Sequence, residues 1–204
     1  MSTMCRMLQL LCNTGYCTPE SCVLVCACTK DCTVLMMQKV DDSDAFDRTW
    51  NEFKVGFGVT SGNYWLGNDQ IHQLTKDGGY ILRVDTESND GGSGPTVSYW
   101  AEYGKFIVDD EANNFKLLNG DYSGDAGDPL GALSGVEFTS KDNDNDDYAD
   151  DNCAVYTYGG FWHDSSCNLR HSCAATAGGT YFRCSTLPDS NTVLIIIQMW
   201  LQCK

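Results

Sequence analysis

The acidic loop KDNDNDDYADDNCA, residues 141–154, is the stretch from which the fold can be worked out. Six of the ten residues 142–151 are aspartates, and no lysine or arginine lies among them. Carboxylates this close together repel one another unless a cation or water screens them. Aspartate and asparagine alternate through residues 142–146, so alternate oxygen-bearing side chains could surround one centre. Such hard oxygen ligands suit calcium, whereas a solvated acidic loop is the plainer interpretation.

An EF-hand does not fit this loop. In the frame that starts at Asp142, position six is Asp147 instead of glycine, and position twelve is Cys153 instead of glutamate. A calcium ion bound here would therefore occupy another kind of loop.

The composition of the chain limits its partners. Its 204 residues are enough for one well-packed core with a small appendage. The formal net charge of −15 argues against nucleic acid or an anionic membrane, and favours cations and neutral or cationic ligands. The apolar run at residues 193–201 is about half as long as a membrane span requires. We therefore expect a buried strand there and no membrane span.

The twelve cysteines predict a disulfide framework formed in an oxidising compartment. Seven of them lie in residues 1–32, which we interpret as a cysteine-rich N-terminal segment before one domain at residues 33–204. The cysteines of residues 22–32 also allow a thiolate metal site, but two adjoining C-x3-C pairs make a poor tetrahedral frame. The first twelve residues do not form a convincing signal peptide.

Short strands and few helices are expected in the domain. Apolar or alternating runs predict strands at residues 33–38, 63–66, 79–85, 97–108, 115–118 and 193–201, with a turn-rich loop at residues 86–94. Phe46, Trp50 and Phe53 recur at helical spacing. They predict a helix at residues 44–55, with Asp44 as its N-cap and Gly56 as its stop.

Six strings, in order along the chain, resemble the fibrinogen C-terminal domain family. They are AFDRTWNEFKVGFG (45–58), YWLGNDQIHQLT (64–75), LRVD (82–85), YSGDAGDPL (122–130), FTSKDNDND (138–146) and NCAVYTYGGFW (152–162). The resemblance is strong for residues 33–167 and weak for residues 168–204. It implies an α+β fold with a mixed, mostly antiparallel sheet, short helices and a loop-rich C-terminal region stabilised by disulfides and calcium. It also implies a secreted recognition domain without enzymatic activity.

The resemblance makes calcium the favoured interpretation of the acidic loop. The family's ligands match the carboxylates of Asp144 and Asp146, and main-chain carbonyls near Tyr148 and Asp150. The other aspartates of the loop would support these ligands or face water; they are Asp142, Asp147 and Asp151.

The resemblance further implies a disulfide between Cys153 and Cys167, beside a ligand pocket. In lectin members of the family, aromatic residues and a histidine line this pocket, which accepts the acetyl group of N-acetylated sugars; in fibrinogen it holds an N-terminal peptide. The family's histidine directly after the second cysteine is absent here. The candidate ligand-binding residues are Tyr156, Tyr158, Trp162, His163 and His171. The aromatic residues among them could instead belong to the core.

Two functions remain open. The first is a lectin-like protein that binds acetylated glycans or glycoproteins. The second is a structural or adhesive subunit of an extracellular oligomer or filament, whose pocket holds a neighbouring chain. Both predict a homo-oligomer, because weak single-site binding needs several copies to be useful. A hydrolase is least favoured, since the implied disulfide would occupy Cys167, the nucleophile it would need.

Overall fold

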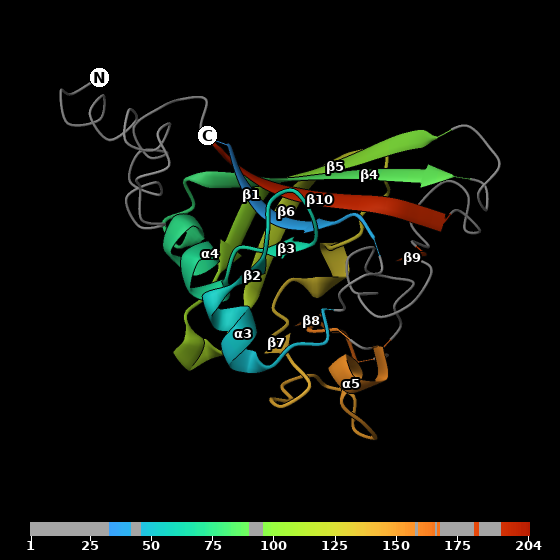
Figure 1. The fold of residues 1–204 in the computed structure, drawn as a ribbon. Helices are drawn as coiled ribbons and strands as arrows, with labels where there is room; N and C mark the ends of the chain where they lie inside the picture. Colours follow the sequence, from blue (N-terminus) through green and yellow to red (C-terminus); the bar gives the residue numbers. More distant parts are fainter. Residues whose placement is uncertain are drawn as a thin grey trace.

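One antiparallel sheet organises the part of the chain that the computed structural model describes, which is residues 33–41, 46–89, 96–157, 159–165, 167, 182–183 and 193–204 (Figure 1). The order of its described strands is β2-β3-β1-β10-β4-β5-β6, with β9 paired to β10. A second, two-stranded sheet pairs β7 with β8. The strands are β1 (Thr33–Lys39), β2 (Phe57–Gly58), β3 (Tyr64–Trp65), β4 (Tyr80–Asn89), β5 (Val97–Val108), β6 (Leu117–Gly124), β7 (Phe138–Thr139), β8 (Phe161–Trp162), β9 (Phe182–Arg183) and β10 (Val193–Cys203).

Short helices accompany these strands. They are α3 (Trp50–Val55), α4 (Asn68–Thr75), α5 (Cys153–Thr157) and the 3-10 turns η1 (Glu111–Asn113) and η2 (Gly131–Leu133). In Figure 1, α3, α4 and α5 all lie on the same side of the main sheet. The predicted α+β class with a mostly antiparallel sheet is confirmed, since every pairing between the described strands is antiparallel.

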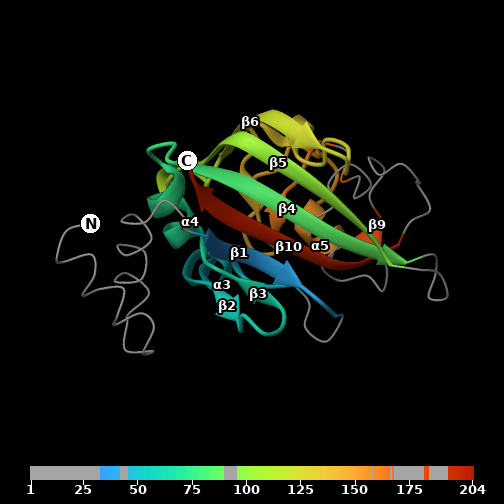
Figure 2. The ribbon, with the colours of Figure 1, turned by 90° about the horizontal axis from the view of Figure 1, so that it is seen from above.

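β10 comes last in the chain, yet it lies in the middle of the sheet between β1 and β4 (Figure 2). Ile197, Met199 and Leu201 are all buried on it. They recur every second residue, which is the period of a strand with one face on the core. The buried strand predicted at residues 193–201 is therefore confirmed. Its position means that β1 and β4 are joined only when the C-terminal residues are in place.

β4 is longer than predicted. It continues through Thr86, Glu87 and Ser88 into the residues expected to form a loop. These three residues pair with β5 on one side and with β10 on the other. Backbone pairing on both sides outweighs the turn preference of the local sequence. β6 likewise extends to Gly124, beyond the predicted residues 115–118, because it pairs along β5.

α3 begins later than the helix predicted at residues 44–55. Its N-cap is Thr49, whose hydroxyl accepts a hydrogen bond from Glu52 N, while the Glu52 carboxylate accepts one from Thr49 N at 2.8 Å. This reciprocal capping box fixes the start of the helix. Phe46 precedes the helix and is buried. Asp44, the predicted N-cap, lies outside the described residues and is not the residue that caps α3.

Gly56 ends α3 as predicted. It has a φ of 93°, and a Cβ there would lie 2.6 Å from the carbonyl oxygen of Leu66. Only glycine adopts this conformation and also permits so close an approach of two backbone segments.

An aromatic cluster packs the two-stranded sheet of β7 and β8 against the main sheet. Phe138 lies at its centre, with ring centroids 5.0 Å from Phe53 and 5.2 Å from Trp162. Trp65 lies 5.6 Å from Phe53 and 6.2 Å from Trp162. All four side chains are buried. Because the acidic loop follows β7 and leads through α5 to β8, this cluster also positions that loop.

Candidate calcium loop and ligand pocket

The acidic loop leaves β7 and is held to it by asparagine side chains. Asn145 donates from its amide to Phe138 O at 2.8 Å, and Asn152 donates to Ser140 O at 3.0 Å. Both asparagines are half-buried, whereas Asp144, directly before Asn145, is exposed. The asparagine side chains therefore hold the loop to the main chain at and after β7. The aspartate carboxylates remain available for other contacts.

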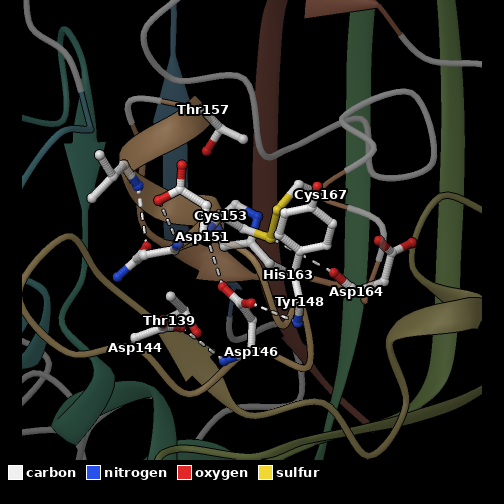
Figure 3. The surroundings of a disulfide bond; sticks show 12 residues. Thr139, Asp144, Asp146, Tyr148, Asp151, Cys153, Thr157, His163, Asp164 and Cys167 are labelled. Atoms are coloured by element: carbon white, nitrogen blue, oxygen red, sulfur yellow. Dashed lines mark hydrogen bonds between the residues drawn. A yellow bond between two sulfur atoms is a disulfide. The ribbon is translucent and has the colours of Figure 1, made fainter.

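Asp144 and Asp146 lie next to each other in this loop (Figure 3). Asp146 N lies 3.4 Å from Asp144 Oδ1 and donates to it. The Asp146 carboxylate accepts two backbone hydrogen bonds of 2.9 Å, from Tyr148 N to Oδ1 and from Cys153 N to Oδ2. Burial raises the pKa of Asp146, and the charge of Asp144 raises it further, although both backbone bonds oppose the shift. The pair therefore concentrates negative charge that a cation would offset.

The donor set of this pair fits calcium. Two carboxylates supply hard oxygens, and each Asp146 oxygen retains a lone pair beyond its backbone bond. Tyr148 lies in the turn that Asp146 holds, and Asp150 is exposed two residues further on. The carbonyls of Tyr148 and Asp150 stay the predicted further ligands. No three His, Cys, Asp or Glu side chains converge in the described residues, so calcium would need main-chain oxygens as well.

The residues just before the predicted ligands fasten the loop to α3. Asp142 Oδ1 accepts hydrogen bonds from Trp50 N at 2.7 Å and from Ser140 Oγ at 2.8 Å. Lys141 donates to Asp47 O at 2.9 Å, and its ammonium lies 3.4 Å from the Asp47 carboxylate. A carboxylate at the start of a helix satisfies an otherwise unpaired N–H and offsets the positive end of the helix dipole.

The sequence pattern did not indicate this anchoring role. Asp142 was predicted to support calcium ligands or to face water; its side chain is exposed, and it also binds a helix start 92 residues earlier in the chain. Contacts over such a separation leave no local signal. Asp147 and Asp151 are exposed.

Cys153 and Cys167 form the disulfide that the family motifs implied (Figure 3). Both are buried, and Cys153 is the first residue of α5. Cys153 N is also one of the two backbone donors to Asp146. One carboxylate thus connects the acidic loop with α5 and the disulfide.

Trp162 belongs to the core, which is the alternative considered for it. Its side chain is 1% exposed, and its indole nitrogen donates to Phe115 O at 2.8 Å. Its ring packs against Phe138 and lies 5.0 Å from that of Phe161. In this arrangement it presents no open face to a ligand, which corrects its predicted place in the pocket lining.

His163 is buried beside Trp162. Its Nε2–H donates to Gly159 O at 2.9 Å, since a carbonyl oxygen can only accept. Burial lowers the pKa of His163 to about 4, so the ring is neutral at pH 7. The ring therefore stabilises the turn at residues 159–163, and in this arrangement it is not at the surface.

Among the candidate ligand-binding residues that the structure describes, Tyr156 is the one at the surface. It lies on α5, and 67% of it is exposed, next to Val155, which is 48% exposed. Large apolar surface of this kind, beside a disulfide, is available for contact with a ligand or another chain. The predicted residues Tyr158 and His171 lie outside the described residues, as do the cysteines of residues 1–32.

Comparison with known proteins assigns the fold to a family. The family model described as the C-terminal globular domain of fibrinogen beta and gamma chains matches residues 20–200. The chain therefore belongs to the fibrinogen C-terminal domain family, as its motifs implied. The match begins at residue 20, within the segment that we separated as cysteine-rich.

Two curated relatives illustrate the similarity. Fibroleukin of Bos taurus is 40% identical over 142 residues, which cover 66% of this chain and 31% of fibroleukin. Fibrinogen-like protein A of Apostichopus parvimensis is 36% identical over 173 residues, which cover 82% of this chain and 59% of that protein. The chain thus spans less than two thirds of the length of either relative.

Solved structures show the same fold. The fibrinogen-like globe domain of human ANGPTL2 matches with a TM-score of 0.70 and 31% identity, over 84% of this chain and 80% of that one. The corresponding domain of human ANGPTL6 matches with a TM-score of 0.70 and 30% identity, over 84% and 78% of the two chains. Within the described residues, no helix has both the length and the apolar character needed to cross a membrane.

Proposed function

We propose that this chain is a secreted, calcium-binding recognition domain that binds acetylated glycans or glycoproteins beside the Cys153–Cys167 disulfide. Family membership supports recognition rather than catalysis. The disulfide leaves neither of these two cysteines as a thiolate nucleophile. Disulfides persist in oxidising compartments, which supports secretion.

The observation that carries the proposal is the double role of Asp146. Its carboxylate neighbours Asp144, at the predicted calcium site, and accepts from Cys153 N at the start of α5. Calcium held by the two carboxylates would offset their repulsion and stiffen the loop on which the disulfide and the exposed Tyr156 depend. The ligand contacts then come from Tyr156, together with Tyr158 and a histidine, for which His171 is the candidate left because His163 is buried.

Calorimetric titration with N-acetylglucosamine and with glucose tests the proposal, because these sugars differ in the acetamido group. We expect binding of N-acetylglucosamine alone, weakened by chelator and by Tyr156→Ala. Val155→Ala is the matched control, since it also removes exposed apolar surface from α5 and should leave binding unchanged. Trp162 is unsuitable for this test, because its loss would disrupt the core. Equal binding of both sugars, or of neither, would contradict the proposal.

The second candidate function is assembly, and the exposed Val155–Tyr156 surface of α5 favours it. An apolar patch at this position suits the segment of a neighbouring copy as well as it suits a sugar. In that case the chain forms homo-oligomers that dissociate on Tyr156→Arg, as measured by light scattering over a range of concentrations. A glycan-binding domain would keep its size in the same variant while losing the sugar.

A further inference from the structure

The outer face of the main sheet carries a groove that lies apart from the acidic loop. Arg83, Asp85 and Glu87 alternate with the buried residues of β4 and so project from the opposite face. Figures 1 and 2 show the described helices at the side of the sheet or beneath it, so none of them crosses this face. The groove formed here, between β10, β4 and β5, measures about 220 Å³.

An ion pair stacked on an indole forms one end of the groove. Arg83 Nε donates to Asp85 Oδ1 at 2.8 Å, and the Arg83 guanidinium lies 4.4 Å from the ring centroid of Trp100. The side chains of Arg83 and Asp85 are 26% and 42% exposed, so both remain accessible. The stack fixes a guanidinium and a carboxylate side by side before any ligand arrives, which lowers the entropy cost of binding.

The strand register places further polar groups in two rows beside this pair. Asp85 lies between Gln198 of β10 and Trp100 of β5. One row further along, about 7 Å away on a strand, Glu87 faces Ser98 of β5. The amide nitrogen of Gln198 donates to Gln38 Oε1, so its carbonyl oxygen can still accept. Side chains that donate or accept hydrogen bonds thus lie side by side across the three strands, with Ile196 of β10 beside Glu87.

We propose that this groove binds one neutral sugar ring, at a site separate from the region beside the disulfide. Hydroxyl groups both donate and accept, so adjacent hydroxyls can be paired by the fixed guanidinium and carboxylate. With Glu87 the three charged residues sum to −1, which disfavours an anionic ligand. A cationic ligand would gain little binding energy here, because Arg83 already stacks on the Trp100 ring and pairs with Asp85. The volume lies below the roughly 300–1,000 Å³ of pockets for drug-sized ligands, which limits the occupant to about one ring.

Nuclear magnetic resonance of the full chain tests this site through the indole N–H signals of its tryptophans. The probes are methyl glycosides of glucose, galactose, mannose and fucose, added at millimolar concentration. At least one should shift the Trp100 signal, which is identified by its loss in Trp100→Leu. The glucuronide that matches a bound glucoside should bind more weakly, because a negatively charged carboxylate replaces the neutral C6 hydroxymethyl group. Glu87→Gln should weaken binding about tenfold, as read from the Trp100 signal, because it removes a charged hydrogen-bond acceptor.

Two control variants locate the site. Trp200→Leu removes a tryptophan from the same face but outside the groove lining, and should leave affinity unchanged. Tyr156→Ala alters the surface used in the proposed function and should leave the affinity of the groove for the glycoside unchanged. The two proposals can therefore fail independently of each other. The proposal is overturned if no glycoside shifts the Trp100 signal, or if the glucuronide binds as tightly as the glucoside. It is also overturned if acetyl-lysine amide, a neutral ligand without a sugar ring, binds in the groove and no glycoside does. An equal loss in Trp200→Leu would also overturn it.

Discussion

Asp146 is the residue through which the acidic loop and the disulfide meet. Its two oxygens accept from Tyr148 N and Cys153 N, so it would order the loop even without a cation. These bonds favour the charged form, yet burial and Asp144 outweigh them and the pKa rises. A carboxylate with a raised pKa costs stability at neutral pH, and that cost disappears as the pH falls through its pKa or as a cation binds. The same residue therefore favours calcium on electrostatic grounds.

His163 provides a pH test of the interior beside the disulfide. Its pKa falls from 6.5 to about 4 in the folded chain, so between these values only the unfolded chain gains the proton. Stability is unaffected above pH 6.5 and falls with decreasing pH by up to about 1.4 kcal/mol per pH unit. His163→Gln removes this dependence and can still donate to Gly159 O.

We therefore expect the free energy of unfolding of the wild type to fall by about 2 kcal/mol more than that of His163→Gln between pH 7.5 and pH 5. Urea denaturation in the presence of chelator measures this difference and keeps calcium out of the comparison. Parallel pH profiles for the two proteins would show that His163 is not buried as described.

At the scale of elements, β5 and β10 were easier to predict than the helix start, the ends of β4 and β6, or the pocket. β5 was predicted with its observed ends and β10 to within two residues, because their apolar and aromatic patterns are local. The start of α3 was missed because the spacing of Phe46 suggested a longer helix, although Thr49 and Glu52 carry the capping signature. For Trp162, composition could not separate pocket from core, since an aromatic ring suits both.

The contact of Asp142 with α3 predicts a stability effect that does not depend on calcium. Asp142→Ala leaves Trp50 N without its 2.7 Å partner, while the Thr49 capping box remains. Loss of a capping side chain costs about 1 kcal/mol, and we expect that decrease in the free energy of unfolding with chelator present. Asp147→Ala removes an exposed carboxylate from the same loop and is the control. An equal effect of the two substitutions would mean that only loop charge matters.

The disulfide predicts a larger effect at the same scale. Replacing Cys153 and Cys167 together by alanine releases a loop of about 15 residues, which costs roughly 3 kcal/mol in the chain-entropy model. Denaturation of the double variant under non-reducing conditions measures this cost. A variant as stable as the wild type would indicate that the bridge does not constrain the unfolded chain.

At the scale of the whole molecule, the acidic loop is connected to the domain at several separate places. The aromatic cluster around Phe138 holds β7 and β8, Asp142 binds the start of α3, and Asp146 binds Cys153 at the disulfide. A cation in the loop is therefore expected to stabilise the domain and not only the loop. The net charge of −15 acts in the same direction, because bound calcium lowers the self-repulsion of the chain.

The most direct test is the unfolding free energy of the full chain as a function of free calcium, for the wild type, Asp144→Asn and the control Asp147→Asn. Binding to the folded state alone contributes about 2.7 kcal/mol when calcium is in hundredfold excess over its Kd. We predict this increase for the wild type and for Asp147→Asn, and its near-complete loss for Asp144→Asn. Unfolding curves that coincide with and without calcium in the wild type would contradict the calcium site, and with it the proposed coupling of the acidic loop to the disulfide.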